Sequence, residues 1–302
     1  MDRFEFMRSA ISRSETGVEI GPLHNPICAK RDGWNTLVMD AFTSLQLRDQ
    51  YCDDPNVDIN LIEDVDILYR RSFRDSIDAY SSNLGDFGSE SSESISYIIS
   101  SHNFEHQPNP IQFLSDCEHC LKLGGSLVMA IPIASRCFDC WLPLTTTGMA
   151  LDAFVSGDEK PSIGAIFDSL QTQARLQNGQ PLHDQTYDYN QVRLDTGFDK
   201  NWLEMLNSNH KINYIDSHVS RFNPFNFELL FRESIQLGLL KQLSLERCVV
   251  SGAEFLTVIK KVKPVESSDC LSSDERTELF KKAVLFHASD VSQDKFLKLQ
   301  FK

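Results

Sequence analysis

The sequence lacks any run of the roughly 18 to 20 uninterrupted apolar residues that a transmembrane helix needs. Its opening segment, MDRFEFMRSAISRSETG, has no apolar stretch of the kind that defines a secretory signal. Basic residues are also scarce, since 29 Lys and Arg stand against 43 Asp and Glu and give a net charge of −14. We therefore expect a cytoplasmic protein with no membrane span and no nucleic-acid partner, because an acidic surface repels phosphates.

Cysteine is sparse as well. Eight cysteines in 302 residues fall far below the density of a disulfide scaffold, so we expect reduced thiols. The pairs Cys117-x2-Cys120 and Cys137-x2-Cys140 have the spacing of a four-cysteine zinc site. A predicted strand separates them, however, and roughly six residues at ~3.3 Å each hold the pairs about 20 Å apart. We therefore predict no metal site and interpret these cysteines as small core residues.

The first part of the chain, residues 1 to about 132, alternates strand and helix patterns. This order predicts an α/β fold with a mostly parallel sheet covered on both faces. We expect strands at 18–20, 35–39, 65–68, 95–99 and 126–131. A helix between the last two begins at Asn109-Pro110, a cap followed by a first-turn proline, and is predicted to end at Gly124-Gly125.

The alternation fails from residue 133 to about 217, which we interpret as a helical or irregular insertion that caps the sheet. A second cap and proline, Asn223-Pro224, predicts a helix that runs to Gly238. Runs at 243–250 and 255–262 then predict an antiparallel hairpin. The main domain would thus span 1–262, and 263–302 would be an appendage or linker with one helix over 274–287. Residues 81–94 are predicted to form an exposed loop.

Ligands of open parallel sheets bind at the carboxyl ends of the strands. The predicted ends carry Glu19, Gly21, Asp40, Asp66, Ser101 and His102. The segment GPLHNP keeps only the first glycine of G-x-G-x-x-G, which disfavours a dinucleotide. S-adenosylmethionine has no pyrophosphate, and an acid on the first strand, a glycine turn and an acid after the second strand suit it.

The motifs VEIGPLHNP, SSHNFEH and LKLGGSLVMAIP occur in the order found in class I S-adenosylmethionine-dependent methyltransferases, and the chain resembles that family. More narrowly, EIGPLHNPI, SHNFEHQPNP, the FD and PLTTTG run at 138–148, PSIGAIFD at 161–168 and HVSRFNP at 218–224 resemble a bacterial group associated with surface-polysaccharide synthesis. The resemblance covers about residues 14–262. It departs from the family at Leu23 and Asn25, where the usual loop has further glycines, and at Ile133-Ala134, which replace a polar pair.

The resemblance implies a Rossmann-like class I methyltransferase sheet with an antiparallel C-terminal hairpin, and S-adenosylmethionine as the cofactor. Glu19 and Gly21 would line its methionine and ribose side, and Asp40 would hold the ribose hydroxyls. Asp66 would meet the adenine, and Ser101 is a further cofactor-binding candidate. Each of these residues taken alone has an ordinary alternative, as a strand end or a helix cap.

Methyl transfer to an alcohol needs a group that takes the hydroxyl proton. His102 is the first candidate for this base, because it follows the central strand directly. Glu105 and His106, one turn further on, would orient His102 or the substrate, or merely brace the loop. Asp139 and His218 are weaker candidates for binding the acceptor.

The leading hypothesis is O-methylation of a sugar hydroxyl in a glycan or glycan precursor. The alternatives are a small-molecule methyltransferase with a nitrogen, carbon or carboxylate acceptor, and a non-catalytic partner protein with a methyltransferase fold.

Overall fold

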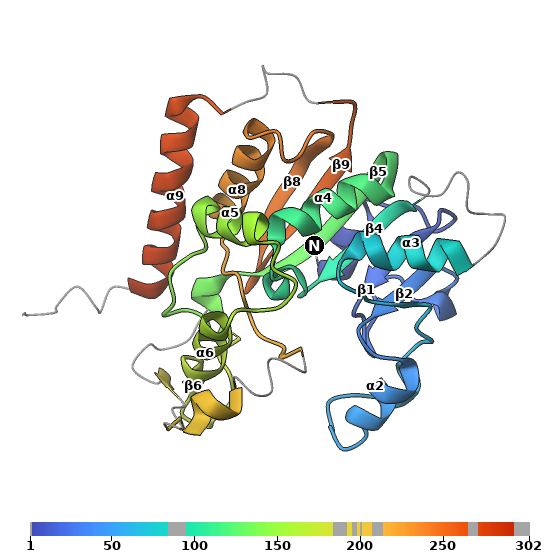
Figure 1. Cartoon of the computed structure of the whole chain (residues 1–302), viewed down its shortest axis with the longest axis horizontal. Helices are drawn as coiled ribbons and strands as arrows, with labels where there is room; N and C mark the ends of the chain where they lie inside the picture. The colour runs from blue at the N-terminus through green and yellow to red at the C-terminus, as the bar shows by residue number, and fades with distance from the viewer. Residues whose placement is uncertain are drawn as a thin grey trace, which may run out of the picture.

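A seven-stranded sheet forms the centre of the molecule in this computed structural model, which describes residues 2–83, 95–183, 192–194, 198–199, 201–206, 214–264 and 271–292 (Figure 1). Its strands are β1 (Gly17–Ile20), β2 (Thr36–Asp40), β3 (Ile67–Leu68), β4 (Ile95–Ser101), β5 (Leu121–Pro132), β8 (Leu243–Ser251) and β9 (Glu254–Lys261). The order across the sheet is β3-β2-β1-β4-β5-β9-β8. Strands β1 to β5 pair in parallel, and β9 is antiparallel to both β5 and β8. The predicted fold class, a Rossmann-like and mostly parallel sheet with an antiparallel C-terminal hairpin, is confirmed.

Helices cover both faces of this sheet. The α-helices are α1 (Arg3–Arg8), α2 (Ser44–Gln50), α3 (Phe73–Asn83), α4 (Pro110–Cys120), α5 (Thr147–Ser156), α6 (Ile163–Gln171), α8 (Pro224–Gln236) and α9 (Ser273–Ser292). Short 3-10 helices are η1 (Lys30–Asp32), η2 (Ile59–Leu61), η5 (Phe104–His106) and η6 (Ala134–Arg136), and β6 (Ala174–Leu176) pairs with β7 (Val192–Leu194). Most of the loop predicted at 81–94 lies outside the described residues.

The core divides at the central strand β4. Ile98 faces the larger cluster, which holds side chains of α3, α4 and α8, whereas Tyr97 and Ile99 face a second cluster that includes Phe6 of α1. Successive strand residues point to opposite faces, so a strand buried on both sides reads as a continuous apolar run. This burial explains why β4 could be predicted from its sequence.

The predicted end of α4 at Gly124-Gly125 is wrong. The helix ends at Cys120, and β5 begins at Leu121, which pairs with Ile95 before an irregularity in the register. Gly124 has φ +82, and a Cβ on Gly125 would lie 3.0 Å from the carbonyl oxygen of Ser96. The two glycines therefore allow a bend and a close backbone approach inside β5.

The helix predicted at 274–287 is present as the longer α9, which lies beside α8 (Figure 1). Leu271 and Leu279 pack with Leu229 of α8. Arg136 of η6 pairs with Asp290 at 2.8 Å. The division into a main domain and an appendage stays a prediction, but α9 is anchored to the rest of the chain at both of these points.

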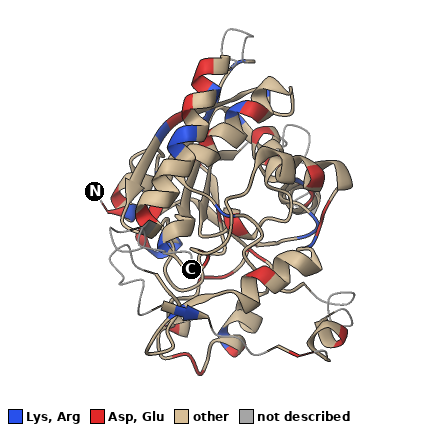
Figure 2. Cartoon of the chain, turned by 90° about the vertical axis from the view of Figure 1, so that its left-hand side faces the viewer, with Lys and Arg blue, Asp and Glu red and all other residues tan. Residues whose placement is uncertain are grey.

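Charged residues are dispersed over the surface. Figure 2 shows acidic residues on many elements of the face in view, with basic residues interspersed among them. Within the described part of the chain, no helix combines the length and the apolar character that crossing a membrane requires.

Candidate active site

The loop after β1 is held by a buried acid. Glu19 is 2% exposed, and its two carboxylate oxygens accept hydrogen bonds from the backbone N–H groups of Ile27 (2.6 Å) and Cys28 (2.8 Å). Burial raises the pKa of Glu19 to about 7, although the two amide bonds oppose this rise. Both oxygens are thus engaged within the protein, and the side chain fixes the loop that follows β1.

Two residues of this loop have left-handed backbone conformations, Gly21 at φ +60 and Leu23 at φ +47. Glycine adopts this region without strain, whereas for leucine it costs roughly 1–2 kcal/mol. Leu23 therefore adopts a backbone conformation that glycine favours. No atom of the described residues lies within 4 Å of where a Cβ of Gly21 would be, so the backbone there is open to a neighbouring molecule.

Asp40 ends β2, next to β1 in the sheet, and is half-buried. Its Oδ1 accepts a hydrogen bond from the N–H of Phe42 at 3.1 Å. Burial raises the pKa of Asp40, against the opposing effect of the Phe42 and Ala41 amides. Asp40 therefore lies at the carboxyl edge where it was predicted.

Asp66, in contrast, precedes its strand. β3 begins at Ile67, so Asp66 lies before the strand. The prediction that Asp66 lies at the carboxyl end of a strand is therefore wrong, although β3 is only 2 residues long. Its carboxylate accepts the N–H of Val38 at 2.7 Å and pairs with Lys30. These bonds tie β3 to β2 and to η1 instead of presenting the acid at the edge.

His102 follows Ser101, the last residue of β4, and has φ +50, which is uncommon for a non-glycine residue. Its Nε2 lies 2.8 Å from Oε2 of Glu254. The guanidinium of Arg3 pairs with the same carboxylate at 2.7 Å and lies 3.3 Å from Nε2.

The negative charge of Glu254 determines which ring nitrogen of His102 carries the proton. Burial raises the pKa of Glu254, but the hydrogen bonds from His102 and Arg3 outweigh it and hold the pKa below its ordinary value. An ionised carboxylate only accepts, so neutral His102 carries its proton on Nε2 and its lone pair on Nδ1.

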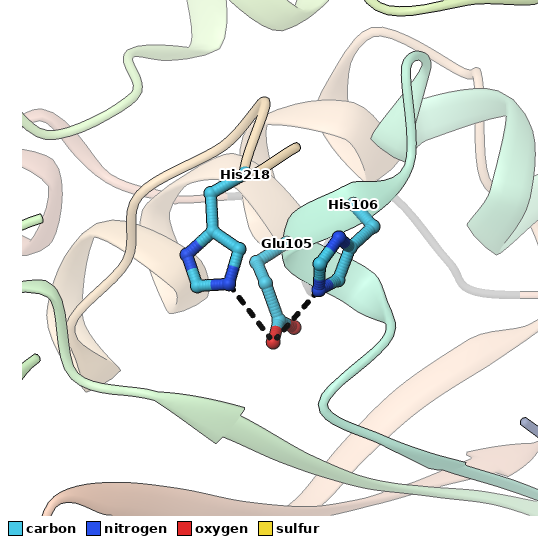
Figure 3. Close-up of side chains that lie close together, drawn as sticks. All are labelled: Glu105, His106 and His218. Atoms are coloured by element: carbon cyan, nitrogen blue, oxygen red, sulfur yellow. Dashed lines mark ion pairs between the residues drawn. The ribbon is translucent and has the colours of Figure 1, made fainter. Parts of the chain in front are cut away.

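Glu105 of η5 is 1% exposed, and among the described residues neither of its carboxylate oxygens has a hydrogen-bond partner. Three imidazole nitrogens surround its Oε1 instead. Nδ1 of His102 and Nε2 of His106 lie at 3.8 Å, and Nε2 of His218 lies at 3.9 Å. Figure 3 shows the rings of His106 and His218 each aiming a nitrogen at the same oxygen. The structure thus brings four of the predicted site residues together.

The opposite nitrogen of two of these imidazoles faces a carboxylate. Nδ1 of His106 lies 2.9 Å from Oδ1 of Asp216, and Nδ1 of His218 lies 2.5 Å from Oδ2 of Asp139. Burial lowers the pKa of His106, but Asp216, Glu105 and Asp139 outweigh burial, and the net pKa is raised. The surrounding acids therefore favour the protonated form of His106.

Backbone hydrogen bonds bring residues 216–220 to η5. The N–H groups of Val219 and Ser220 both donate to the carbonyl oxygen of Glu105, at 2.8 and 3.0 Å. Arg221, 4% exposed, places Nε 3.8 Å from Oδ1 of Asp139. Asp139 therefore lies between Arg221 and His218, where it orients the imidazole and is engaged on both sides.

Three residues near the site were not predicted. Glu254 and Asp216 are the carboxylates that face His102 and His106. His183 is the third, because burial and the charges of His102 and His218 lower its pKa. No local spacing marks these residues, since each reaches the site through the tertiary fold.

The four cysteines of the two C-x2-C pairs are buried, as predicted. Cys117 and Cys120 belong to the main core, while Cys140 packs in a separate small cluster. Burial raises the pKa of Cys137 well above its ordinary value, which favours the thiol over the metal-binding thiolate. Within the described residues, two groups are compact enough to hold an ion: Glu105, His106 and His218; and Cys137, Asp139 and His218.

Comparison with known proteins gives similarity at the level of solved structures only. No family model matches the sequence, and no curated protein matches it. An S-adenosylmethionine-dependent methyltransferase from Aquifex aeolicus is 10% identical with a TM-score of 0.40, covering 86% of this chain and 90% of that chain. The CcbJ methyltransferase from Streptomyces caelestis is 11% identical with a TM-score of 0.40, covering 86% and 94%. A putative Zn-dependent alcohol dehydrogenase from Rhodobacter sphaeroides is 10% identical with a TM-score of 0.43, covering 86% and 90%.

Proposed function

We propose that this protein is an S-adenosylmethionine-dependent methyltransferase that methylates a hydroxyl oxygen. The observation that carries the proposal is the arrangement of one sheet edge. Gly21 follows β1, Asp40 ends the neighbouring β2, and His102 follows β4 on the other side of β1. Ligands of such sheets bind at this edge.

The residues at the edge fit the proposed cofactor. The open backbone of Gly21 allows close approach of a ligand, and the half-buried carboxylate of Asp40 suits the two hydroxyls of a ribose. Glu19 acts through the loop that it fixes. Ser101, at the end of β4, stays a predicted contact, whereas Asp66 is assigned no cofactor contact because its carboxylate is bonded elsewhere. When bound, S-adenosylmethionine supplies an electrophilic methyl group on a sulfonium.

His102 is proposed as the group that accepts the proton of the acceptor hydroxyl. Glu254 holds the proton of neutral His102 on Nε2, which leaves the lone pair of Nδ1 to act as the base. The strained φ of His102 is consistent with a side chain held in place for a function. A base in a fixed position and an aligned acceptor together provide much of the rate of such a displacement.

The acceptor is proposed to be a sugar hydroxyl of a glycan or glycan precursor. This part rests on the resemblance of the sequence motifs to the polysaccharide-associated group. His218, proposed as an acceptor contact, faces the same oxygen of Glu105 as His102 does. Asp139, the other proposed acceptor contact, acts by orienting His218. Small-molecule acceptors with nitrogen, carbon or carboxylate nucleophiles are the alternative.

Cofactor binding is tested by calorimetry with S-adenosylmethionine and S-adenosylhomocysteine. We expect one site per chain, and Asp40→Asn should weaken binding by about 10-fold or more, because a hydrogen bond to a charged group contributes about 1.5–3 kcal/mol. Asp64→Asn is the matched control, since Asp64 is 85% exposed and pairs only with Arg48 among the described residues. An absence of binding heat in the unmodified protein would favour the non-catalytic partner.

The base is tested with His102→Asn, because asparagine tolerates a left-handed backbone. With an acceptor identified by transfer of a labelled methyl group to candidate sugars, turnover should fall by about 10²–10⁴-fold while cofactor affinity stays the same. Unchanged turnover would reject His102 as the base.

A further inference from the structure

The carboxylate of Glu105 is buried without a hydrogen-bond partner among the described residues, which lowers the stability of the folded chain. Its side chain is 2% exposed, and neither oxygen has a hydrogen-bond partner among the residues that the structure describes. An isolated carboxylate removed from water is strongly destabilised unless an opposite charge or hydrogen bonds compensate it. A positively charged group at this point would compensate the carboxylate.

The two nearest imidazoles are oriented as electron-pair donors toward the same point. Asp139 accepts a hydrogen bond from Nδ1 of His218 and so holds a proton on that nitrogen. The Asp216 carboxylate lies 2.9 Å from Nδ1 of His106 as an ion-pair partner, and its negative charge favours the proton on that side of the ring. In the neutral rings the Nε2 lone pairs then point at Oε1 of Glu105 (Figure 3). Three electron-pair donors from two separate segments thus converge.

Neither a proton nor one water molecule serves this arrangement fully. A proton on Nε2 of His106 or His218 would leave nitrogen and oxygen 3.8 or 3.9 Å apart, too far for a hydrogen bond. A water molecule has two protons for three acceptors. A metal ion bonded at about 2.1 Å allows two ligand atoms to be up to roughly 4.2 Å apart, so both separations fit.

We propose that Glu105, His106 and His218 bind one divalent transition-metal ion, with Asp216 and Asp139 orienting the two imidazoles. Two imidazoles and one carboxylate suit ions such as Zn²⁺, Fe²⁺ and Mn²⁺. Three protein ligands leave coordination positions for a further oxygen ligand. A role of the ion in binding the acceptor hydroxyl rests on the proposed function, whereas binding of the ion itself does not.

The test uses the full chain, stripped with a chelator and then titrated with Zn²⁺ by calorimetry and with Co²⁺ by visible absorption, without cofactor or acceptor. We expect one ion per chain and an absorption band from Co²⁺ bound to imidazole nitrogen. Glu105→Gln should abolish stoichiometric binding. Asp216→Asn alters an exposed residue and so should fold, and it should weaken binding by about 10–100-fold. His287→Asn, on α9, is the matched control and should bind as the unmodified chain does.

Two results would overturn the proposal. One is that the unmodified chain binds neither Zn²⁺ nor Co²⁺ stoichiometrically. The other is that the folded Asp216→Asn variant binds as tightly as the unmodified chain. Calorimetry with S-adenosylmethionine on the stripped chain keeps the two proposals separate, because a chain that binds the ion but not the cofactor would refute only the proposed function.

Discussion

Replacing Glu19 by Gln should remove a pH dependence of stability that arises from one buried carboxyl. Glu19 has a pKa of about 7 in the folded protein, raised by burial from its ordinary value of 4.5. Below pH 4.5 the carboxyl is protonated in both the folded and the unfolded chain. Between pH 4.5 and 7 the unfolded chain ionises first, so the free energy of unfolding falls as the pH rises. Above pH 7 the carboxyl is ionised in both states, and the fall ends.

The magnitude follows from the size of the shift. At about 1.4 kcal/mol per unit, a rise from 4.5 to about 7 corresponds to about 3 kcal/mol in total. About 2.5 kcal/mol of this falls between pH 5 and pH 8. Glutamine cannot ionise, so this contribution disappears from the variant. The variant should also be less stable at pH 8, because its NH₂ group meets the N–H of Ile27 or Cys28 where an acceptor is needed.

The assay is reversible urea unfolding at pH 5 and pH 8. Between these two values the unmodified protein should lose about 2.5 kcal/mol more than Glu19→Gln. The control is Glu63→Gln, because Glu63 also accepts two consecutive amides, those of Lys30 and Arg31, outside the buried core. This control should retain most of the pH dependence that Glu19 causes, because the charge of Glu63 raises the pKa of Glu19 less than burial does. Parallel pH profiles of Glu19→Gln and the unmodified protein would refute the reasoning.

Three further changes test contacts that stabilise the fold. Gly17→Ala would place a Cβ 2.1 Å from the ring of Tyr97, so we expect a loss of about 1–3 kcal/mol in thermal unfolding; an unchanged melting temperature would contradict this close contact. Arg136→Ala removes the bond to Asp290, and α9 should become more sensitive to limited proteolysis with a loss of about 1–2 kcal/mol; equal cleavage rates would show that the pair does not hold α9. Asn223→Ala should cost about 1–3 kcal/mol in urea unfolding, because it removes the capping acceptor of α8 and the donor to the carbonyl oxygen of Ala283; an unchanged unfolding midpoint would contradict both roles.

Much of the fold could be predicted because its signals are local. Asn109 and Asn223 cap α4 and α8, each with proline in the first turn, as predicted. The predicted end of α4 was wrong because a left-handed glycine occurs both after helices and inside bent strands. Only the pairing of β5 with β4 shows that Gly124 belongs to a strand. Similarly, a strand as short as β3 moves Asp66 off the edge through a boundary difference of one or two residues.

The candidate site was predictable only where chemistry and chain position coincide. His102, Glu105 and His106 follow the central strand within one short segment, so their proximity follows from the strand itself. His218 lies far away in the sequence, and only its resemblance to a family motif drew attention to it. Glu254 is placed by the register of β9 against β5, where it pairs with Pro132.

The tautomers of the three histidines around Glu105 are therefore a property of the tertiary structure. His102 and His218 take their proton positions from hydrogen bonds to carboxylates on other segments, Glu254 and Asp139. For His106 the same effect comes from the nearby charge of Asp216, 2.9 Å from Nδ1, without a hydrogen bond. Because those acids hold the distal protons, the nitrogens left as acceptors are the ones that face Glu105. An isolated peptide containing SHNFEH would have neither the fixed tautomers nor the converging lone pairs. Any cation affinity of this cluster should consequently be lost on unfolding, so ion binding there would stabilise the folded chain by an amount that grows with the logarithm of the ion concentration above the dissociation constant.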